Sequence, residues 1–163
     1  MEKVMNNELK EFERLLNQDW MMKEEGYSFK ILKDKTNNEA DEIVDVITMQ
    51  VFTDDELLYT YSTAQIFGTL EENIKSIIGA IYNEDINYRK RIIRNYKGSF
   101  LSRKIKSLNN AIAKGNTDKV NAINMEIIEK YKQSEKCKNE LVEFKSFISL
   151  LYRTKDLLIS KVA

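Results

Sequence analysis

The chain has no proline and only five glycines among its 163 residues. Proline ends helices because its ring clashes with the preceding turn and removes a backbone donor, and glycine weakens helices through its backbone entropy. With so few residues of either kind, a helix can continue wherever the apolar pattern allows. We therefore expect long helices to dominate the fold.

The usage of histidine and cysteine excludes several classes of function. The chain has no histidine, the commonest general base, and a single cysteine, Cys137. We therefore expect no cofactor, no metal site and no disulfide, and a cytoplasmic location. The longest run without a charged residue, 57–70, has 14 residues, and because a membrane-spanning helix needs about 20, we expect no membrane segment.

An apolar stripe near the N-terminus predicts the first helix. Large apolar residues recur there at helical spacing: Leu9, Phe12, Leu16 and Trp20. They form one face of a helix over about 7–25. Gly26 follows, in the position of a C-terminal cap glycine.

Three β-branched or alternating runs then predict strands, at 27–32, 42–52 and 56–63. The polar residues 34–41 predict a loop between the first two strands. Thr69 and Glu72 form a capping box before an apolar run, which predicts a helix over about 70–83. The predicted fold class is α+β and helix-rich, with an N-terminal α-β-β-β-α domain, a three-stranded antiparallel sheet and a C-terminal helical region.

The next segment carries two apolar stripes that do not line up. The first stripe is Ile92, Ile93, Tyr96 and Phe100, and the second is Leu101, Ile105, Leu108 and Ile112. At about 100° per residue, the second stripe is turned by roughly 135° from the first. A straight helix cannot bury both stripes against one surface, so we expect a kink or a break near Gly98.

The last segment predicts one long helix over about 117–162, after a turn near Gly115. Apolar residues recur along it with three- and four-residue spacing, which permits coiled-coil packing. Part of the helix should fold back as a helical hairpin. We expect the rest to form an oligomer interface, in a homodimer, through Leu141, Phe144, Ile148, Leu151 and Leu158.

The net charge of zero conceals an asymmetry between the two halves. Residues 1–85 carry 8 basic and 19 acidic side chains, and residues 86–163 carry 18 basic and 7 acidic ones. The halves therefore have net charges of −11 and +11. The change of sign predicts two domains, an acidic α+β domain at 1–85 and a basic all-helical domain at 86–163.

The segment 87–106 holds eight basic side chains and no acidic one. It supplies the candidate nucleic-acid contacts: Arg89, Lys90, Arg91, Arg94, Lys97, Arg103, Lys104, Lys106 and the ring of Tyr88. Clustered lysine and arginine residues suit a phosphate-binding surface, and the aromatic rings suit base stacking. Two other interpretations of the charge stay open at this point, namely pairing with the acidic half and simple solvation. Tyr96 and Phe100 share a stripe with isoleucines, which favours burial of their rings.

The sequence contains no clear catalytic motif. The main acidic clusters are Glu39–Asp45, Asp54–Glu56, Glu71–Glu72 and Glu84–Asp85. A magnesium-dependent nuclease, the weaker alternative to a non-enzymatic role, would need such carboxylates beside a lysine, and Asp45 has none at nuclease-like spacing. Asp54–Asp55 has turn chemistry, and Cys137 falls on an apolar stripe, which predicts a core thiol.

We therefore expect a non-enzymatic accessory protein that binds nucleic acid through residues 86–106. The alternative is a protein-interaction module or inhibitor that binds a host protein, with the long C-terminal helix mediating dimerisation. An anti-defence protein encoded by a phage or mobile element is one example, since the richness in Lys, Asn and Ile suggests AT-rich coding DNA.

Overall fold

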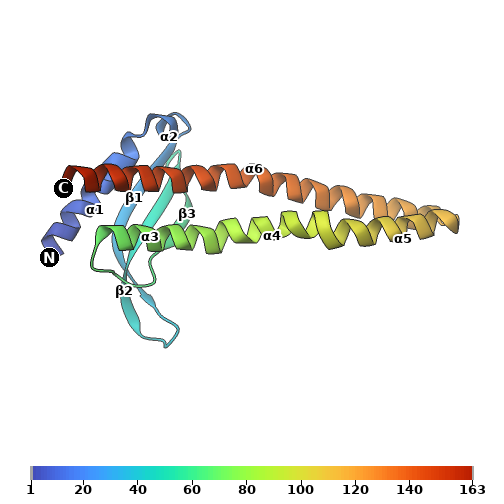
Figure 1. The fold of residues 1–163 in the computed structure, drawn as a ribbon, viewed down its shortest axis with the longest axis horizontal. Coiled ribbons are helices and arrows are strands. Elements are labelled where there is room, and N and C mark those ends of the chain that lie inside the picture. The colour runs from blue at the N-terminus through green and yellow to red at the C-terminus, as the bar shows by residue number, and fades with distance from the viewer. Residues whose placement is uncertain (1, 163) are drawn as a thin grey trace. The chain divides into compact units, whose positions relative to one another are not determined.

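The computed structural model describes residues 2–162, with the side chains of residues 5–160. Figure 1 shows a helix-rich chain with one antiparallel sheet near its N-terminus, followed by a long C-terminal helix. The predicted α+β fold class is confirmed. In chain order the elements are α1 (Glu2–Gln18), α2 (Trp20–Glu24), β1 (Tyr27–Asn37), β2 (Ile43–Thr53), β3 (Glu56–Ser62), α3 (Leu70–Ile81), the π turn η1 (Tyr82–Ile86), α4 (Asn87–Asn95), the π turn η2 (Tyr96–Phe100), α5 (Leu101–Ala113) and α6 (Thr117–Val162).

The contacts within the chain group into two compact units. The sheet unit contains residues 2–82 and 146–162, and the hairpin unit contains residues 83–145. Helix α6 therefore contributes its first part to the hairpin unit and its last part to the sheet unit. The division into separately folding domains at 1–85 and 86–163 stays a prediction.

One face of the antiparallel sheet β1-β2-β3 carries much of the core of the sheet unit. Phe29 pairs in register with Val51, and Met49 pairs with Tyr61. All four side chains are buried, because alternate residues of a strand point to the same face. Strand β1 continues to Asn37, well beyond its predicted end at residue 32, because its polar residues pair in register with β2.

The first helix differs from its prediction at one end. Leu9, Phe12 and Leu16 are buried as expected, but Trp20 is 66% exposed. Helix α1 ends at Gln18, and the Asp19 side chain then accepts a hydrogen bond from the Met22 amide, which starts the short helix α2. The new helix begins a new phase, so Met22 is buried in place of Trp20.

The last part of α6 also packs on the sheet. The Phe147 ring meets the edges of three other rings, at centroid distances of 5.2 Å from Tyr27 and 6.2 Å from both Phe29 and Tyr59. It is 1% exposed. Edge-to-face aromatic pairs of this kind add to the free energy gained from burial alone, so Phe147 is a main attachment of α6 to the sheet.

The hairpin unit consists of two antiparallel helical arms. The first arm is residues 87–113, and the second arm is residues 117–145 of α6. They are joined at Gly115, whose φ of 66° is one that other residues rarely adopt. In the contacts between the arms, residue numbers rise along the first arm as they fall along the second, as antiparallel packing requires. The contacting pairs are Arg89 with Glu140, Tyr96 with Tyr131, and Lys104 with Glu126.

A π turn takes the place of the kink or break that we expected near Gly98. The Leu101 amide donates to the Tyr96 carbonyl, five residues back instead of four. One extra residue in the turn rotates the following residues by about 100°, which offsets most of the predicted 135° between the two stripes. Ala111 is consequently buried. Ile105 and Ile112, which belong to the predicted stripe, lie at the edge of the buried side of the arm and are 45% and 59% exposed.

The aromatic attachment of α6 gives a first prediction. Phe147→Ala should lower the free energy of unfolding by about 3–5 kcal/mol, the usual cost of removing a buried aromatic ring. Tyr152→Ala, on the same helix but 41% exposed, is the matched control and should cost less than about 1 kcal/mol. Urea denaturation measures both, and equal losses in the two variants would contradict this packing.

The two glycines of the hairpin unit should respond in opposite ways to alanine. Gly98 has open space around its Cβ position, so Gly98→Ala should stabilise the chain by about 0.5–1 kcal/mol through helix propensity. Gly115 also has open space, but its φ is positive, so Gly115→Ala should destabilise it by about 1–2 kcal/mol. Thermal unfolding of the two variants compares them directly; a stabilising Gly115→Ala would rule out the left-handed turn.

Candidate nucleic-acid interface on the first arm

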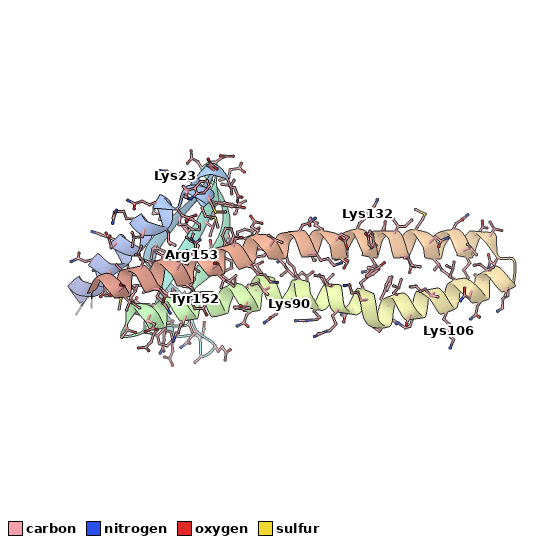
Figure 2. The ribbon with its side chains drawn as sticks, turned by 45° about the horizontal axis from the view of Figure 1, so that its top comes forward. Lys23, Lys90, Lys106, Lys132, Tyr152 and Arg153 are labelled. Carbon is pink, nitrogen blue, oxygen red and sulfur yellow. The ribbon has the colours of Figure 1, made fainter. Side chains whose placement is uncertain are left out.

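The nine predicted contact residues all lie on helical segments of the first arm. Six basic side chains among them are exposed: Lys90, Arg91, Arg94, Lys97, Arg103 and Lys106. Figure 2 shows Lys106 on the first arm and Lys132 on the second arm, with their side chains directed away from each other. Lys106 therefore lies on the outer side of the first arm, whereas Arg103 lines the groove between the two arms.

Arg89 is engaged within the chain. Its Nη1 atom lies 2.9 Å from Asp85 Oδ1, and its Nη2 atom lies 3.2 Å from Glu140 Oε2. The guanidinium also sits 4.6 Å from the centroid of the Phe144 ring, and the side chain is only 14% exposed. Burial alone would lower the pKa of Arg89, but the hydrogen bonds to Glu140 and Asp85 outweigh it and raise the pKa. We therefore leave Arg89 out of the interface.

Lys104 also has a partner across the hairpin. Its ammonium pairs with the Glu126 carboxylate of the second arm and lies 5.8 Å from the centroid of the Phe100 ring. Both charged side chains are partly exposed, so the pair adds little to stability. The Glu126 carboxylate nevertheless neutralises the charge of Lys104. We therefore place Lys104 outside the core of the interface.

The six exposed cations differ from Arg89 and Lys104 in this respect. Among the residues that the structure describes, none of them lies within ion-pair distance of a carboxylate. Pairing with the acidic half, one of the open interpretations, is therefore not seen for them. Lys90 and Arg94 are one turn apart on α4, and Lys97 follows on the next turn, so these three share one side of the arm.

A groove runs between the two arms, on the side of α4 away from Lys90, Arg94 and Lys97. It has a volume of about 330 Å³ and is lined by Tyr88, Ile92, Asn95, Tyr96, Ser99, Phe100, Arg103, Lys130 and Gln133. The lining contains three aromatic rings and two cations, and no carboxylate. Tyr96 lies 6.1 Å, centroid to centroid, from both Phe100 and Tyr131, so the rings support one another.

The sequence identified only part of this groove. Lys130 and Gln133 were missed because they lie on the second arm, where Lys130 only interrupts an apolar stripe. The turn at Gly115 is the signal that could have found them, since an antiparallel hairpin centred there brings residues 130–133 opposite η2. The ring of Tyr88, predicted as a contact, does line the groove and is 52% exposed.

The residues expected at an oligomer interface are already buried within a single chain. Leu141, Phe144, Ile148, Leu151 and Leu158 are between 0% and 8% exposed within a single chain. Because they are already removed from solvent, they offer almost no surface to a second copy. The three- and four-residue spacing of this stripe therefore reflects packing within the chain.

Two of the predicted acidic clusters lie in a turn and on the sheet. Asp54 and Asp55 have φ values of 49° and 67° in the turn between β2 and β3, a role that short polar side chains tolerate. Asp45 lies 4.0 Å from Lys35 across the sheet, and both side chains are well exposed. Among the described side chains, no three acidic or cysteine residues come close enough together to hold a metal ion.

Comparison with known proteins gives no match to a family model, a curated protein or a solved structure. Over the part of the chain that the structure describes, no helix combines the length and apolar character that crossing a bilayer requires.

The environment of Cys137 predicts an unreactive thiol. Burial, with a smaller contribution from the charge of Glu140, raises the pKa of this thiol, and the residue is 5% exposed. A neutral, buried thiol is a poor nucleophile. A thiol reagent at neutral pH should therefore modify the native chain far more slowly than the urea-unfolded chain, and equal rates would contradict the buried position.

Proposed function

We propose that this chain is a non-enzymatic accessory protein that binds nucleic acid through the outer side of the first arm. The observation that carries the proposal is the set of six exposed cations without carboxylate partners in the described structure. Phosphates that bind such cations release condensed counterions, which favours binding. Cations held by the chain's own carboxylates, as Arg89 is, would not gain this free energy.

The dimensions of the arm support the proposal. Lys90 and Lys106 are 16 residues apart, which corresponds to about 24 Å along a helix. A nucleic-acid strand in a duplex advances about 3.4 Å per phosphate, so the arm extends past about seven phosphates. Three of the six cations are arginines, whose planar fork can hold a phosphate through two hydrogen bonds.

The alternative of an interaction module that dimerises through the C-terminal helix receives less support. Its five interface residues are buried within one chain. The acidic side chains that would attract a basic host protein are spread over helices, strands and turns of the sheet unit. A phage or mobile-element origin stays a prediction from composition.

A charge-matched pair of variants tests the proposal. The test variant replaces Lys90, Arg94 and Lys97 by Gln, and the control replaces Lys119, Lys132 and Lys136, which are exposed on the second arm. Fluorescence anisotropy with a labelled oligonucleotide should show strong salt dependence for the unaltered chain. The slope of log K against log salt should fall by about 2–3 in the test variant, because each lost phosphate contact contributes about 0.7–0.9.

The control should keep most of the affinity and the slope of the unaltered chain. Binding that is absent at low salt would refute the proposal. Equal losses in the two triple variants would also contradict it, because they would assign the attraction to total charge and not to the first arm.

A further inference from the structure

We infer that the groove between the two arms is a binding site for one base of a single-stranded nucleic acid, with its phosphate held by Arg103 and Lys130. This inference rests on the proposed function and deepens it, because it specifies which kind of nucleic acid the chain binds. The chemistry of the lining supports such a ligand. Aromatic rings, amides and cations occur together there without any carboxylate, which suits a ligand with a flat ring and a negative charge.

The aromatic rings provide a stacking surface. Tyr88 lines the groove and is 52% exposed, so its ring is open to a ligand. Tyr96 and Phe100 also line the groove, and ring contacts within the hairpin support them. A base can stack on such a ring only where its flat face is free, as in a single strand; in a duplex both faces are covered by neighbouring base pairs.

The cations of the groove are held ready for an anion. The Arg103 Nε atom donates to the Ser99 carbonyl at 3.2 Å, which fixes the orientation of the guanidinium. Its two terminal nitrogens make no hydrogen bond within the described structure, and they can bind a phosphate through two donors. Lys130 comes from the opposite arm and is exposed, so the two positive charges face the ligand from both sides.

The π turn contributes directly to this site. Tyr96, Ser99 and Phe100 all belong to η2 and all line the groove. Turns of this kind inside a helix frequently occur at functional sites, because the extra residue alters which side chains share a face. The same turn thus aligns the apolar stripe and places two rings and a carbonyl at the groove.

The size of the groove limits the ligand. Its volume of about 330 Å³ is at the low end of the ~300–1,000 Å³ typical of small-molecule sites, which suits a single nucleotide. A longer strand would continue over the outer side of the arm. At about 100° per residue, Arg91 lies within about 60° of Tyr88 and Asn95 around the axis of α4, so it is the first exposed cation beside the groove.

Three labelled probes of equal length test the inference: oligothymidylate, its duplex with oligoadenylate, and a strand with the same sugar-phosphate backbone but no bases. Fluorescence anisotropy should show the tightest binding for oligothymidylate. Tyr88→Ala should weaken that binding about 5- to 150-fold, the change expected from one stacked base, and should leave the affinity for the base-free strand unchanged.

Two further variants control for loss of structure. Tyr88→Phe keeps the ring and should bind oligothymidylate as the unaltered chain does. Tyr152→Ala removes a comparably exposed ring from the sheet unit and should also have no effect. Circular dichroism checks that all variants keep their helices.

The outcomes separate this inference from the proposed function. Equal affinity for all three probes, with no effect of Tyr88→Ala, would overturn the base-binding groove but leave nucleic-acid binding by the outer cations intact. Tighter binding of the duplex would overturn it in the same way. If no probe binds at low salt, both the groove and the proposed function are refuted.

Discussion

The π turn at Tyr96–Phe100 is the feature on which the hairpin depends. Without it, the apolar residues of α4 and α5 would face directions about 135° apart, and only one of the two helices could pack against the second arm. The extra residue allows the helix to continue without a break while it changes phase. Leu101 and Leu108 are then partly covered and Ala111 is buried.

The same change of phase determines where the charges lie. A helix that buries one side of its whole length must expose the other, and six of the eight basic residues of the first arm are exposed. The extended row of cations is therefore a consequence of how the arm packs. The absence of proline makes this possible, because a proline within residues 87–113 would have broken the arm.

Two kinds of cation are distinguished by this packing. Arg89 and Lys104 face the second arm and pair with Glu140 and Glu126. Arg89 is the more enclosed of the two, and removal of its carboxylate partners would leave a partly buried charge uncompensated. The exposed cations have no such structural role in the described chain, so they can be replaced without a comparable cost in stability.

The sequence predicted the elements better than it predicted their contacts. The strands and the long helix followed from local periodicity, since the side-chain pattern along one segment is enough to identify them. The exposure of Trp20 and the extension of β1 to Asn37 depend on a local cap and on strand pairing. Neither leaves a mark in the apolar pattern of a single element.

The residues of the candidate site could likewise be predicted only where they are close together in the sequence. The basic residues could be found because they are consecutive in the chain, but the partners of Arg89 and the groove residue Lys130 are distant in sequence. The stripe from Leu141 to Leu158 was assigned to a second copy of the chain because an apolar face does not reveal what covers it. In the folded structure the chain itself covers these residues.

The most direct test of the account is a map of backbone amide chemical shifts during titration with a short single-stranded oligonucleotide at low salt. The account predicts that the shifts change along residues 88–106 and at 130–133, where the exposed cations and the groove lie. Changes confined to the sheet unit, or no changes at saturating oligonucleotide, would contradict it.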